Sequence, residues 1–316
     1  MSGAEVEPAG TTAADAGLIV WRLLDGKPGH MNQSAGLVAA LARRTPVRQF
    51  DLDAPPAASS LSGWLWRQFP PGQDLPAPDL ILAAGHATHL PALAARRARG
   101  GRVILLMGPS LPLRWFDLCL IPAHDDPPPR DNVLRTLGAL NTVQPGGPHD
   151  ADLGLFLIGG PSAAHAWNDD AILGQIRGVL DRQPGVRFRL TTSRRTPATL
   201  LPRLAALGDL DLVPWQETRA GWVAQQLANA GQVWVSEDSV SMIYEALTSG
   251  AQVGLLAVPR TRTGRVALGV EQLAGAGQVV RLHDWLDGTP LPRPASGFDE
   301  AGRCADAILG RWFKEN

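Results

Sequence analysis

The chain has 316 residues, of which 45% are hydrophobic and 19% charged, the composition of a globular protein with room for two domains of roughly 150 residues each. Its net charge of -1 excludes the strongly basic surface that non-specific nucleic-acid binding requires, so we expect no nucleic-acid partner. Two cysteines without ligand spacing, no long apolar run and no signal peptide predict a cytoplasmic protein, with peripheral contact at the inner face of the membrane as a further expectation.

The first strand and the loop after it carry the first candidate site. Residues 1–16, mostly Ala, Gly, Thr and acidic residues, predict a flexible leader, and the apolar run Leu18–Leu24 predicts a strand. The turn DGKPGH follows, in which glycines allow a ligand close to the backbone, a lysine supplies a cation and a histidine exchanges a proton near neutral pH. The candidate catalytic residues are His30 and Asp25, in a loop completed by Gly26, Lys27 and Gly29, with Asn32 and Gln33 opening a helix. A tight turn without chemistry is the alternative interpretation.

Aromatic, histidine and arginine side chains mark the middle of the first half. Trp64 and Trp66 are expected to pack against the domain, with a membrane interface as the alternative role. A buried strand at residues 80–84 runs into GHATH, whose two histidines have metal-like spacing but no third ligand, so we predict no metal site. The arginines of residues 96–102 suit either a solvated helix end or a surface for anionic lipid or phosphate.

Further strands are predicted at residues 103–107 and 116–121, before the turn-rich stretch QPGGP at 144–148. This stretch is predicted to separate a first domain, residues 17–148, from a second domain, residues 149–297. The segment 298–316 is helical by pattern and is expected to pack at the domain junction.

Polar loops follow successive strands of the second half. The strand at residues 153–158 ends in Gly159-Gly160, which would let the backbone approach a diphosphate, or simply make a tight turn. The strand at 188–191 runs into Ser193-Arg194-Arg195, and the planar guanidinium suits phosphate. Such loops at the carboxyl ends of parallel strands lie where open α/β sheets bind ligands.

The stretch from Gln232 to Pro259 predicts a strand, a helix and a second strand. Its turn, Ser236-Glu237-Asp238-Ser239, offers a polar N-cap, and Gly250 suits a left-handed helix end. The helix N-terminus favours an anion, while Ser241 and Glu245 share a helix face and could meet the hydroxyls of a ribose or sugar. A well-capped surface helix is the alternative. The donor-binding candidates are therefore Gly159, Gly160, Ser193, Arg194, Arg195, Ser236, Glu237, Asp238, Ser239, Ser241 and Glu245.

The whole pattern predicts an α/β protein with two Rossmann-like, doubly wound domains facing across a cleft, which resembles the GT-B glycosyltransferases. The helix at 240–249 resembles the donor-site helix of the peptidoglycan N-acetylglucosaminyl transferase, and that likeness implies that Glu245 holds the ribose. A closer resemblance, to the mitochondrial-fission Elm family, spans nearly the whole chain through DGKPGHMNQ, FDLCLIPAHD, NVLRTLGALN, LIGGPS, TSRRTP and SEDSVSMIYEAL. It implies the GT-B fold and glycosyltransferase activity, with the acceptor-side domain in residues 17–148 and the nucleotide-sugar-binding domain in residues 149–297.

The expected function is metal-independent transfer of a sugar from a nucleotide-diphosphate donor to an envelope glycolipid or polysaccharide, with no cofactor besides the nucleotide-sugar co-substrate. Arg194 or Arg195 would offset the charge of the leaving diphosphate, and His30 or Asp25 would take the proton of the acceptor. Two alternatives stay open: a nucleotide-sugar 2-epimerase, and a non-catalytic adaptor that binds a partner at a membrane.

Overall fold

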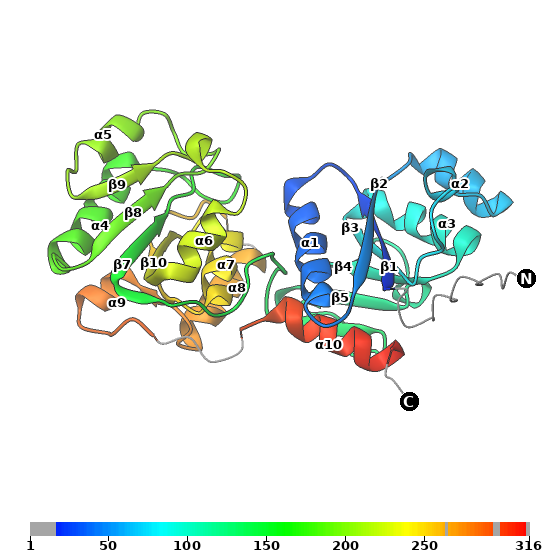
Figure 1. Cartoon of the computed structure of the whole chain (residues 1–316). Coiled ribbons are helices and arrows are strands. Elements are labelled where there is room, and N and C mark those ends of the chain that lie inside the picture. The colour runs from blue at the N-terminus through cyan, green and yellow to red at the C-terminus, as the bar shows by residue number, and fades with distance from the viewer. Residues whose placement is uncertain (1–16, 263–264, 293–297, 314–316) are drawn as a thin grey trace, which may run out of the picture. The chain divides into compact units, whose positions relative to one another are not determined.

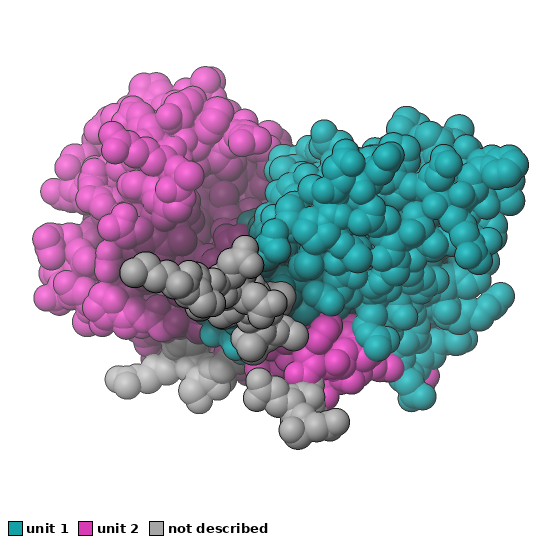
Figure 2. Space-filling model, turned by 45° about the vertical axis from the view of Figure 1, so that its right-hand side comes forward, with its two compact units in different colours: residues 1–120, 130–132 teal, residues 121–129, 133–316 magenta. Residues whose placement is uncertain are grey.

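A computed structural model describes residues 17–262, 265–292 and 298–313. The predicted leader at 1–16 lies outside the described residues. The chain forms two compact units: unit 1 comprises Met1–Leu120 and Arg130–Asn132, and unit 2 comprises Ile121–Pro129 and Val133–Asn316 (Figure 2).

The strands of the first sheet alternate with helices along the chain (Figure 1). Its elements are β1 (Leu18–Leu24), α1 (Pro28–Ala42), β2 (Val47–Asp53), α2 (Ala57–Trp66), β3 (Leu80–Ala84), α3 (His89–Arg99), β4 (Arg102–Leu106), β5 (Leu118–Pro122) and β6 (Val133–Thr136). The strand order is β2-β1-β3-β4-β5-β6, and the pairings from β2 to β5 are parallel. β3 and most of β4 are buried and apolar, as expected for strands covered on both faces.

Two strands of this sheet, β2 and β6, were not predicted from the sequence. β2 reads VRQFDLD, with Leu52 as its one buried residue, because it lies at the sheet edge. β6, with four residues at the opposite edge, is too short to show a period. Edge strands bury little apolar side chain and therefore leave a weak pattern in the sequence.

Unit 2 contains the second sheet, which is parallel throughout (Figure 1). Its elements are β7 (Asp150–Leu157), α4 (Asp169–Arg182), β8 (Arg187–Thr191), α5 (Leu201–Ala205), β9 (Leu210–Val213), α6 (Trp222–Asn229), β10 (Ala230–Ser236), α7 (Val240–Ser249), β11 (Gln252–Leu256), α8 (Arg265–Gly275), β12 (Val280–Arg281), α9 (Leu282–Leu286) and α10 (Glu300–Trp312). The strand order is β12-β11-β10-β7-β8-β9.

The second sheet separates two hydrophobic cores. Leu155 and Leu157 of β7 pack in one core with residues of α6, α7 and α8, while Phe156 and Ile158 pack in the other with residues of α4. Alternation of side chains along a strand explains this division. The unit therefore has the layered architecture of a doubly wound domain, as predicted.

Both sheets have a topological switch point, where neighbouring strands lead to connections on opposite sides of the sheet. In the first sheet it lies between β1 and β3, and in the second between β7 and β10. Ligands of open α/β sheets bind at the carboxyl ends of such strand pairs. These are the strands that DGKPGH, GHATH, Gly159-Gly160 and the turn Ser236–Ser239 follow.

The segment between β6 and β7 belongs to unit 2, so the unit boundary precedes the predicted one at residue 148. Tyr244 Oη donates to the carbonyl oxygen of Leu137 at 2.9 Å, and Asn141 Nδ2 donates to Thr248 Oγ1 at 3.0 Å. Glu300 of α10 accepts a hydrogen bond from the Leu137 amide at 2.8 Å. These contacts fix the segment and the C-terminal helix to unit 2.

Trp64 and Trp66 of α2 are exposed, so the expectation that both pack against the domain is wrong.

The thiols and the helix lengths complete the description of the fold. Cys119 and Cys304 are buried free thiols, and burial is the main cause that raises the pKa of each to about 12. Among the described helices, none combines the length and apolar character needed to cross a membrane.

Candidate functional site

A histidine–carboxylate pair lies at the switch point of the first sheet. His30 Nδ1 is 2.7 Å from Asp25 Oδ2, and the Asp25 side chain is only 2% exposed. Asp25 Oδ1 also accepts a hydrogen bond from the backbone N–H of Lys27 at 3.1 Å. Burial alone would raise the pKa of Asp25, but the bonds from His30 and Lys27 outweigh it, and the pKa lies below its usual value. Asp25 therefore stays ionised and orients the imidazole.

Gly85, which sequence reasoning did not select, makes room for this pair. Its φ of +88° is in the left-handed region, and a Cβ there would lie 2.3 Å from His30 Nδ1 and 2.8 Å from Asp25 Oδ2. A glycine directly after a buried strand was the available signal. Two loops, after β1 and β3, thus build one site within unit 1.

The other predicted residues of this loop lie around the start of α1. Gly26 has φ +74°, Lys27 is the N-cap of α1, and Gly29 is exposed in its first turn. α1 begins at Pro28, earlier than predicted, because proline suits the first helical turn. Asn32 and Gln33 therefore lie inside the helix, where Gln33 Nε2 donates to the Met107 sulfur at 3.5 Å.

His89 lies in the same unit and is buried. Its Nδ1 is 3.2 Å from Ser110 Oγ, and its ring meets those of His86 and Phe116 edge-on. Burial, followed by the influence of His86, lowers the pKa of His89 from 6.5 to about 4. The neutral imidazole is therefore the form that fits the folded protein.

Because the pKa of His89 is lowered in the folded protein, we expect the protein to lose stability on acidification. Unfolded chains bind a proton at His89 below pH 6.5 and the native protein binds it only near pH 4, so its contribution is complete above pH 6.5 and decreases as the pH falls. Between pH 7 and pH 5 the free energy of unfolding should fall by about 2 kcal/mol from this group alone. Urea unfolding at both pH values measures it. His89→Gln should remove that part, whereas His283→Gln, at an exposed histidine, should not; an equal slope in His89→Gln would contradict the assignment.

In unit 2, the loops after β7 and β10 are interlocked. Gly159 N–H donates to Ser236 Oγ at 2.8 Å, and Gly160 N–H donates to Asp238 Oδ2 at 3.0 Å. A Cβ on Gly159 would lie 2.1 Å from Asp238 Oδ2, and one on Gly160 would lie 2.1 Å from the Arg195 carbonyl oxygen. Both glycines are buried with their amides bonded, so they hold the loops together and do not present N–H groups to a diphosphate, contrary to the prediction.

Arg195 joins the third loop, after β8, to this frame. Its guanidinium lies 2.7 Å from the Asp238 carboxylate and donates to the carbonyl oxygen of Gly160 at 2.6 Å. Asp238 Oδ1 is buried without a hydrogen-bond partner among the described atoms. Ser193 Oγ bonds within its own turn, accepting from the Arg195 amide at 3.2 Å. Arg195 thus neutralises a buried carboxylate while its own side chain stays exposed, and its contact with a phosphate remains a prediction.

Glu237 has a comparable structural role in a charged network. Its Oε1 accepts from Arg281 Nε at 2.9 Å, and Arg260 lies 3.9 Å from its other oxygen. Both arginines also pair with Glu271 of α8, at 2.8 and 2.6 Å, and their hydrogen bonds, that of Arg281 first, lower the pKa of Glu271. Glu237 is buried, and this network fixes the turn after β10. Glu237 therefore has a structural role in place of the ligand contact that was predicted for it.

The N-terminus of α7 has no side-chain cap. Ser239 is the N-cap residue, but its side chain makes no capping hydrogen bond, unlike Asn168 of α4 and Asp299 of α10, which cap their helices. The first-turn amides therefore keep the character of an anion site. Gly250 ends the helix with φ +95°, as predicted.

Five predicted residues have the exposure that a ligand contact needs, and Arg195, which is exposed, and Ser193, which is half-buried, are two of them. Ser241 is exposed in the first turn of α7, and Glu245 is half-buried one turn later. Arg194 is exposed and its guanidinium lies 5.7 Å from the ring centre of Trp215, an aromatic side chain that sequence reasoning did not select. Guanidinium, hydroxyl and carboxylate groups at the carboxyl edge of one sheet can bind a phosphorylated sugar nucleotide. Ser236, Glu237, Asp238 and Ser239, all buried, form the frame behind them.

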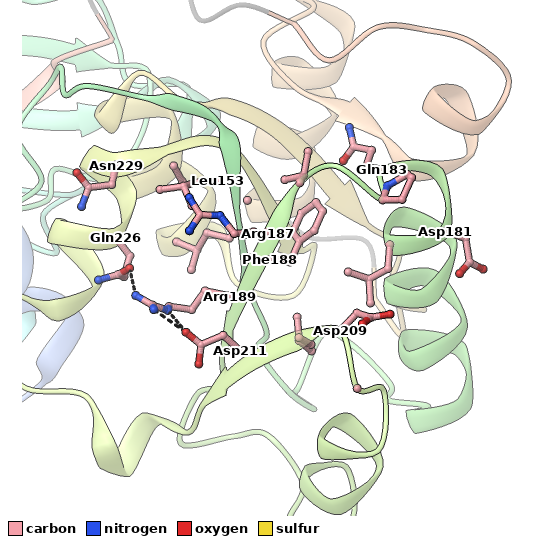
Figure 3. A pocket seen from close by; sticks show the side chains of 18 of the residues that line it. Leu153, Asp181, Gln183, Arg187, Phe188, Arg189, Asp209, Asp211, Gln226 and Asn229 are labelled. Carbon is pink, nitrogen blue, oxygen red and sulfur yellow. Dashed lines mark hydrogen bonds and ion pairs between the residues drawn. The ribbon is translucent and has the colours of Figure 1, made fainter.

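A cavity of about 1150 Å³ lies elsewhere in unit 2 (Figure 3). It is lined by the amino-terminal parts of β7, β8 and β9 and by the ends of α4 and α6, and includes none of the predicted donor residues. Arg189 bonds to Asp211 at 2.5 Å and to Gln226 at 2.7 Å there. The cavity has exposed charged groups too, but it lies at the amino-terminal parts of the strands, whereas open α/β sheets bind ligands at the carboxyl ends. Within the described residues no group of three or more His, Cys, Asp or Glu side chains could hold a metal ion.

Solved structures with the same fold include enzymes of two kinds, UDP-GlcNAc 2-epimerases and glycosyltransferases. A candidate UDP-N-acetylglucosamine 2-epimerase of Listeria monocytogenes is 14% identical with a TM-score of 0.59, covering 95% of this chain and 98% of its own. The Neisseria meningitidis UDP-GlcNAc 2-epimerase bound to UDP-GlcNAc is 13% identical with a TM-score of 0.54, covering 93% and 99%. CalG4, the calicheamicin glycosyltransferase, is 13% identical with a TM-score of 0.51, covering 95% and 100%. These likenesses establish the GT-B-type fold.

Sequence comparison assigns the family. The protein RP120 of Rickettsia prowazekii (strain Madrid E), described as uncharacterised, is 22% identical over an alignment that covers 80% of this chain and 87% of RP120. The family model described as Mitochondrial fission ELM1 matches residues 28–312, from the first turn of α1 to the end of α10. It thus includes both sheets except β1. The chain belongs to the Mitochondrial fission ELM1 family.

Proposed function

We propose that the protein binds a nucleotide-diphosphate sugar on unit 2 and transfers the sugar to a glycolipid or polysaccharide acceptor. The observation that carries the proposal is the uncapped N-terminus of α7 at a topological switch point, with Arg194 exposed on a loop of the same sheet edge. The fold shared with enzymes named for UDP-GlcNAc and for glycosyl transfer supports it.

In the proposed donor site, some residues contact the ligand and others hold those residues in place. The α7 amides and Arg194 meet the diphosphate and offset its charge as the bond between the sugar and the phosphate oxygen breaks. Glu245 accepts hydrogen bonds from the ribose hydroxyls, and Ser241 donates to a phosphate oxygen. Asp238 and Glu237 hold these groups in place through Arg195 and Arg281.

The proposed base lies on unit 1. Because His30 Nδ1 faces Asp25, its Nε2 is the atom that takes the proton from the acceptor hydroxyl as that oxygen attacks the sugar. The ionised Asp25 stabilises the imidazolium that forms. The proposal requires no metal ion, because helix amides and a guanidinium supply the positive charge.

Calorimetry with a panel of nucleoside diphosphates and their sugars tests the donor site. One nucleotide is expected to bind the wild type with saturation, and Arg194→Gln should weaken it by about 10- to 100-fold, because a charge-assisted hydrogen bond is lost. Glu245→Ala should lower affinity for nucleotides that carry the ribose hydroxyls. The matched control is Arg177→Gln, at an exposed arginine of α4, which should leave affinity unchanged.

Product analysis separates the alternatives. Incubation with the bound nucleotide sugar alone should leave the sugar unchanged, since transfer needs an acceptor, whereas inversion at its second carbon would identify a 2-epimerase. A wild-type protein that binds none of the panel would refute the enzyme proposal and favour the adaptor.

A further inference from the structure

Helix α2 of unit 1 exposes its large apolar side chains and buries its small ones. Ser60 and Gly63 are its buried residues, whereas Leu61, Trp64, Leu65 and Trp66 are 58%, 38%, 61% and 70% exposed. Leu61 and Leu65 are one turn apart and so share a face, with Trp64 beside them. A surface helix of a globular protein normally shows the reverse pattern.

The inner face of α2 is small because the helix packs closely on α3 (Figure 1). Ser60 Oγ donates back to the carbonyl oxygen of Pro56 at 3.0 Å, which satisfies its hydroxyl group inside the helix. The face of α3 that is buried contains alanines at positions 92, 94 and 95. The buried face of α2 therefore contains neither its leucines nor its tryptophans, and of these side chains Trp64 contacts α3 through Arg97.

Exposed arginines lie beside this apolar face, and the nearest acidic residues along the chain, Asp53 and Asp74, lie outside the helix. Residues 54–73 and 89–102 contain five arginines and no aspartate or glutamate, in a chain whose net charge is -1. The arginines have different engagements: Arg97 lies 4.4 Å from the ring centre of Trp64, Arg96 pairs with Asp117 at 3.0 Å, and Arg99 donates to the carbonyl oxygens of Gln73 and Leu75. Arg67 is exposed directly after the helix, where it ends α2 in a left-handed conformation.

We propose that α2 docks on an anionic lipid bilayer, with Leu61, Leu65 and the two tryptophans in the interfacial layer and Arg67 and Arg97 against the headgroups. Tryptophan prefers the membrane–water interface because its ring is apolar and its N–H is polar. A helix whose apolar face is flanked by arginines lies in the plane of such a membrane. The segment 54–73, with Arg67 as its one charged residue, has no acidic group that would repel anionic headgroups.

Co-sedimentation of the full-length protein with vesicles tests this surface. The protein should bind vesicles of phosphatidylcholine with roughly 30% phosphatidylglycerol and bind pure phosphatidylcholine at least tenfold more weakly, and about 0.5 M NaCl should reduce the difference. Leu65→Ser/Trp66→Ser should lower the partition constant at least tenfold, because two apolar side chains no longer enter the interface. Arg67→Gln/Arg97→Gln should lower it about tenfold or more on anionic vesicles.

A matched control comes from Trp115→Ser/Leu137→Ser, which removes one exposed tryptophan and one exposed leucine outside α2 and should leave binding unchanged. Thermal unfolding of each variant should match the wild type, since the replaced side chains are exposed. Failure of the wild type to bind anionic vesicles, or equal losses in the control, overturns the proposal. Self-association that Leu65→Ser/Trp66→Ser abolishes, without vesicle binding, would assign the face to a second copy of the chain. None of these readouts depends on sugar transfer.

Discussion

His30→Ala is expected to lower the rate of sugar transfer by about 10²- to 10⁴-fold while the affinity for the donor nucleotide stays unchanged. The expectation rests on the 2.7 Å contact with Asp25, which fixes the ring, and on the low pKa of Asp25, which keeps a negative charge beside it at neutral pH. Donor affinity should survive because the proposed donor contacts belong to unit 2.

Initial rates with saturating donor, together with calorimetry, measure the two effects separately. Asp25→Asn keeps the size of the side chain and removes its charge, so the transfer rate of this variant should fall below that of the wild type. The control variant His283→Ala should transfer sugar at the wild-type rate. Asp25 acts through His30, and its substitution should therefore also shift the acidic limb of the pH–rate profile. Unchanged turnover in His30→Ala would exclude His30 from the mechanism.

Gly160→Ala is expected to destabilise the protein by about 3–5 kcal/mol or to prevent folding. The added Cβ would lie 2.1 Å from the carbonyl oxygen of Arg195 and 2.8 Å from the amide nitrogen of Thr196, both backbone atoms that no rotamer change can move. Separating the loops after β7 and β8 would break the bond from Gly160 N–H to Asp238 and strain the ion pair of Asp238 with Arg195, and so leave a buried carboxylate without its partners.

Urea unfolding monitored by circular dichroism measures this effect. Gly174→Ala is the matched control, because a Cβ at that position of α4 meets nothing within 4 Å, and the change should stabilise the protein by up to about 1 kcal/mol. If Gly160→Ala unfolds at the wild-type urea concentration but no longer binds nucleotide, Gly160 contacts the ligand as first predicted and the interlocked frame is refuted.

Sequence patterns predicted the fold of this protein well because its central strands are buried on both faces. The run Leu80–Ala84 shows no polar residue, and its predicted bounds match β3. The loops with candidate chemistry were also found, since glycines, arginines and acidic residues follow the strand ends. β2 was missed, because its single buried leucine gives no period to detect.

The roles within the site were harder to predict, since burial and pairing depend on residues far apart in the chain. Asp238 and Glu237 have the chemistry of ligand contacts, but both are buried, and Arg195, 43 positions before Asp238, and Arg281, 44 positions after Glu237, pair with them. Arg194 and Arg195 are exposed neighbours of the same type, and only the structure shows that Arg195 pairs with Asp238. Gly85 was recognisable as a strand-end glycine, but its contact with His30 depends on the adjacency of β1 and β3.

The two buried thiols have a practical consequence for spectroscopy. Thiol-directed dyes react with the accessible thiolate, and burial together with a pKa of about 12 leaves Cys119 and Cys304 almost wholly protonated and shielded at neutral pH. Cysteines introduced at one exposed position on each unit could therefore be labelled without first removing the natural ones. A donor and an acceptor dye attached in this way would report, by energy transfer, how the separation of the two units changes when a nucleotide sugar binds.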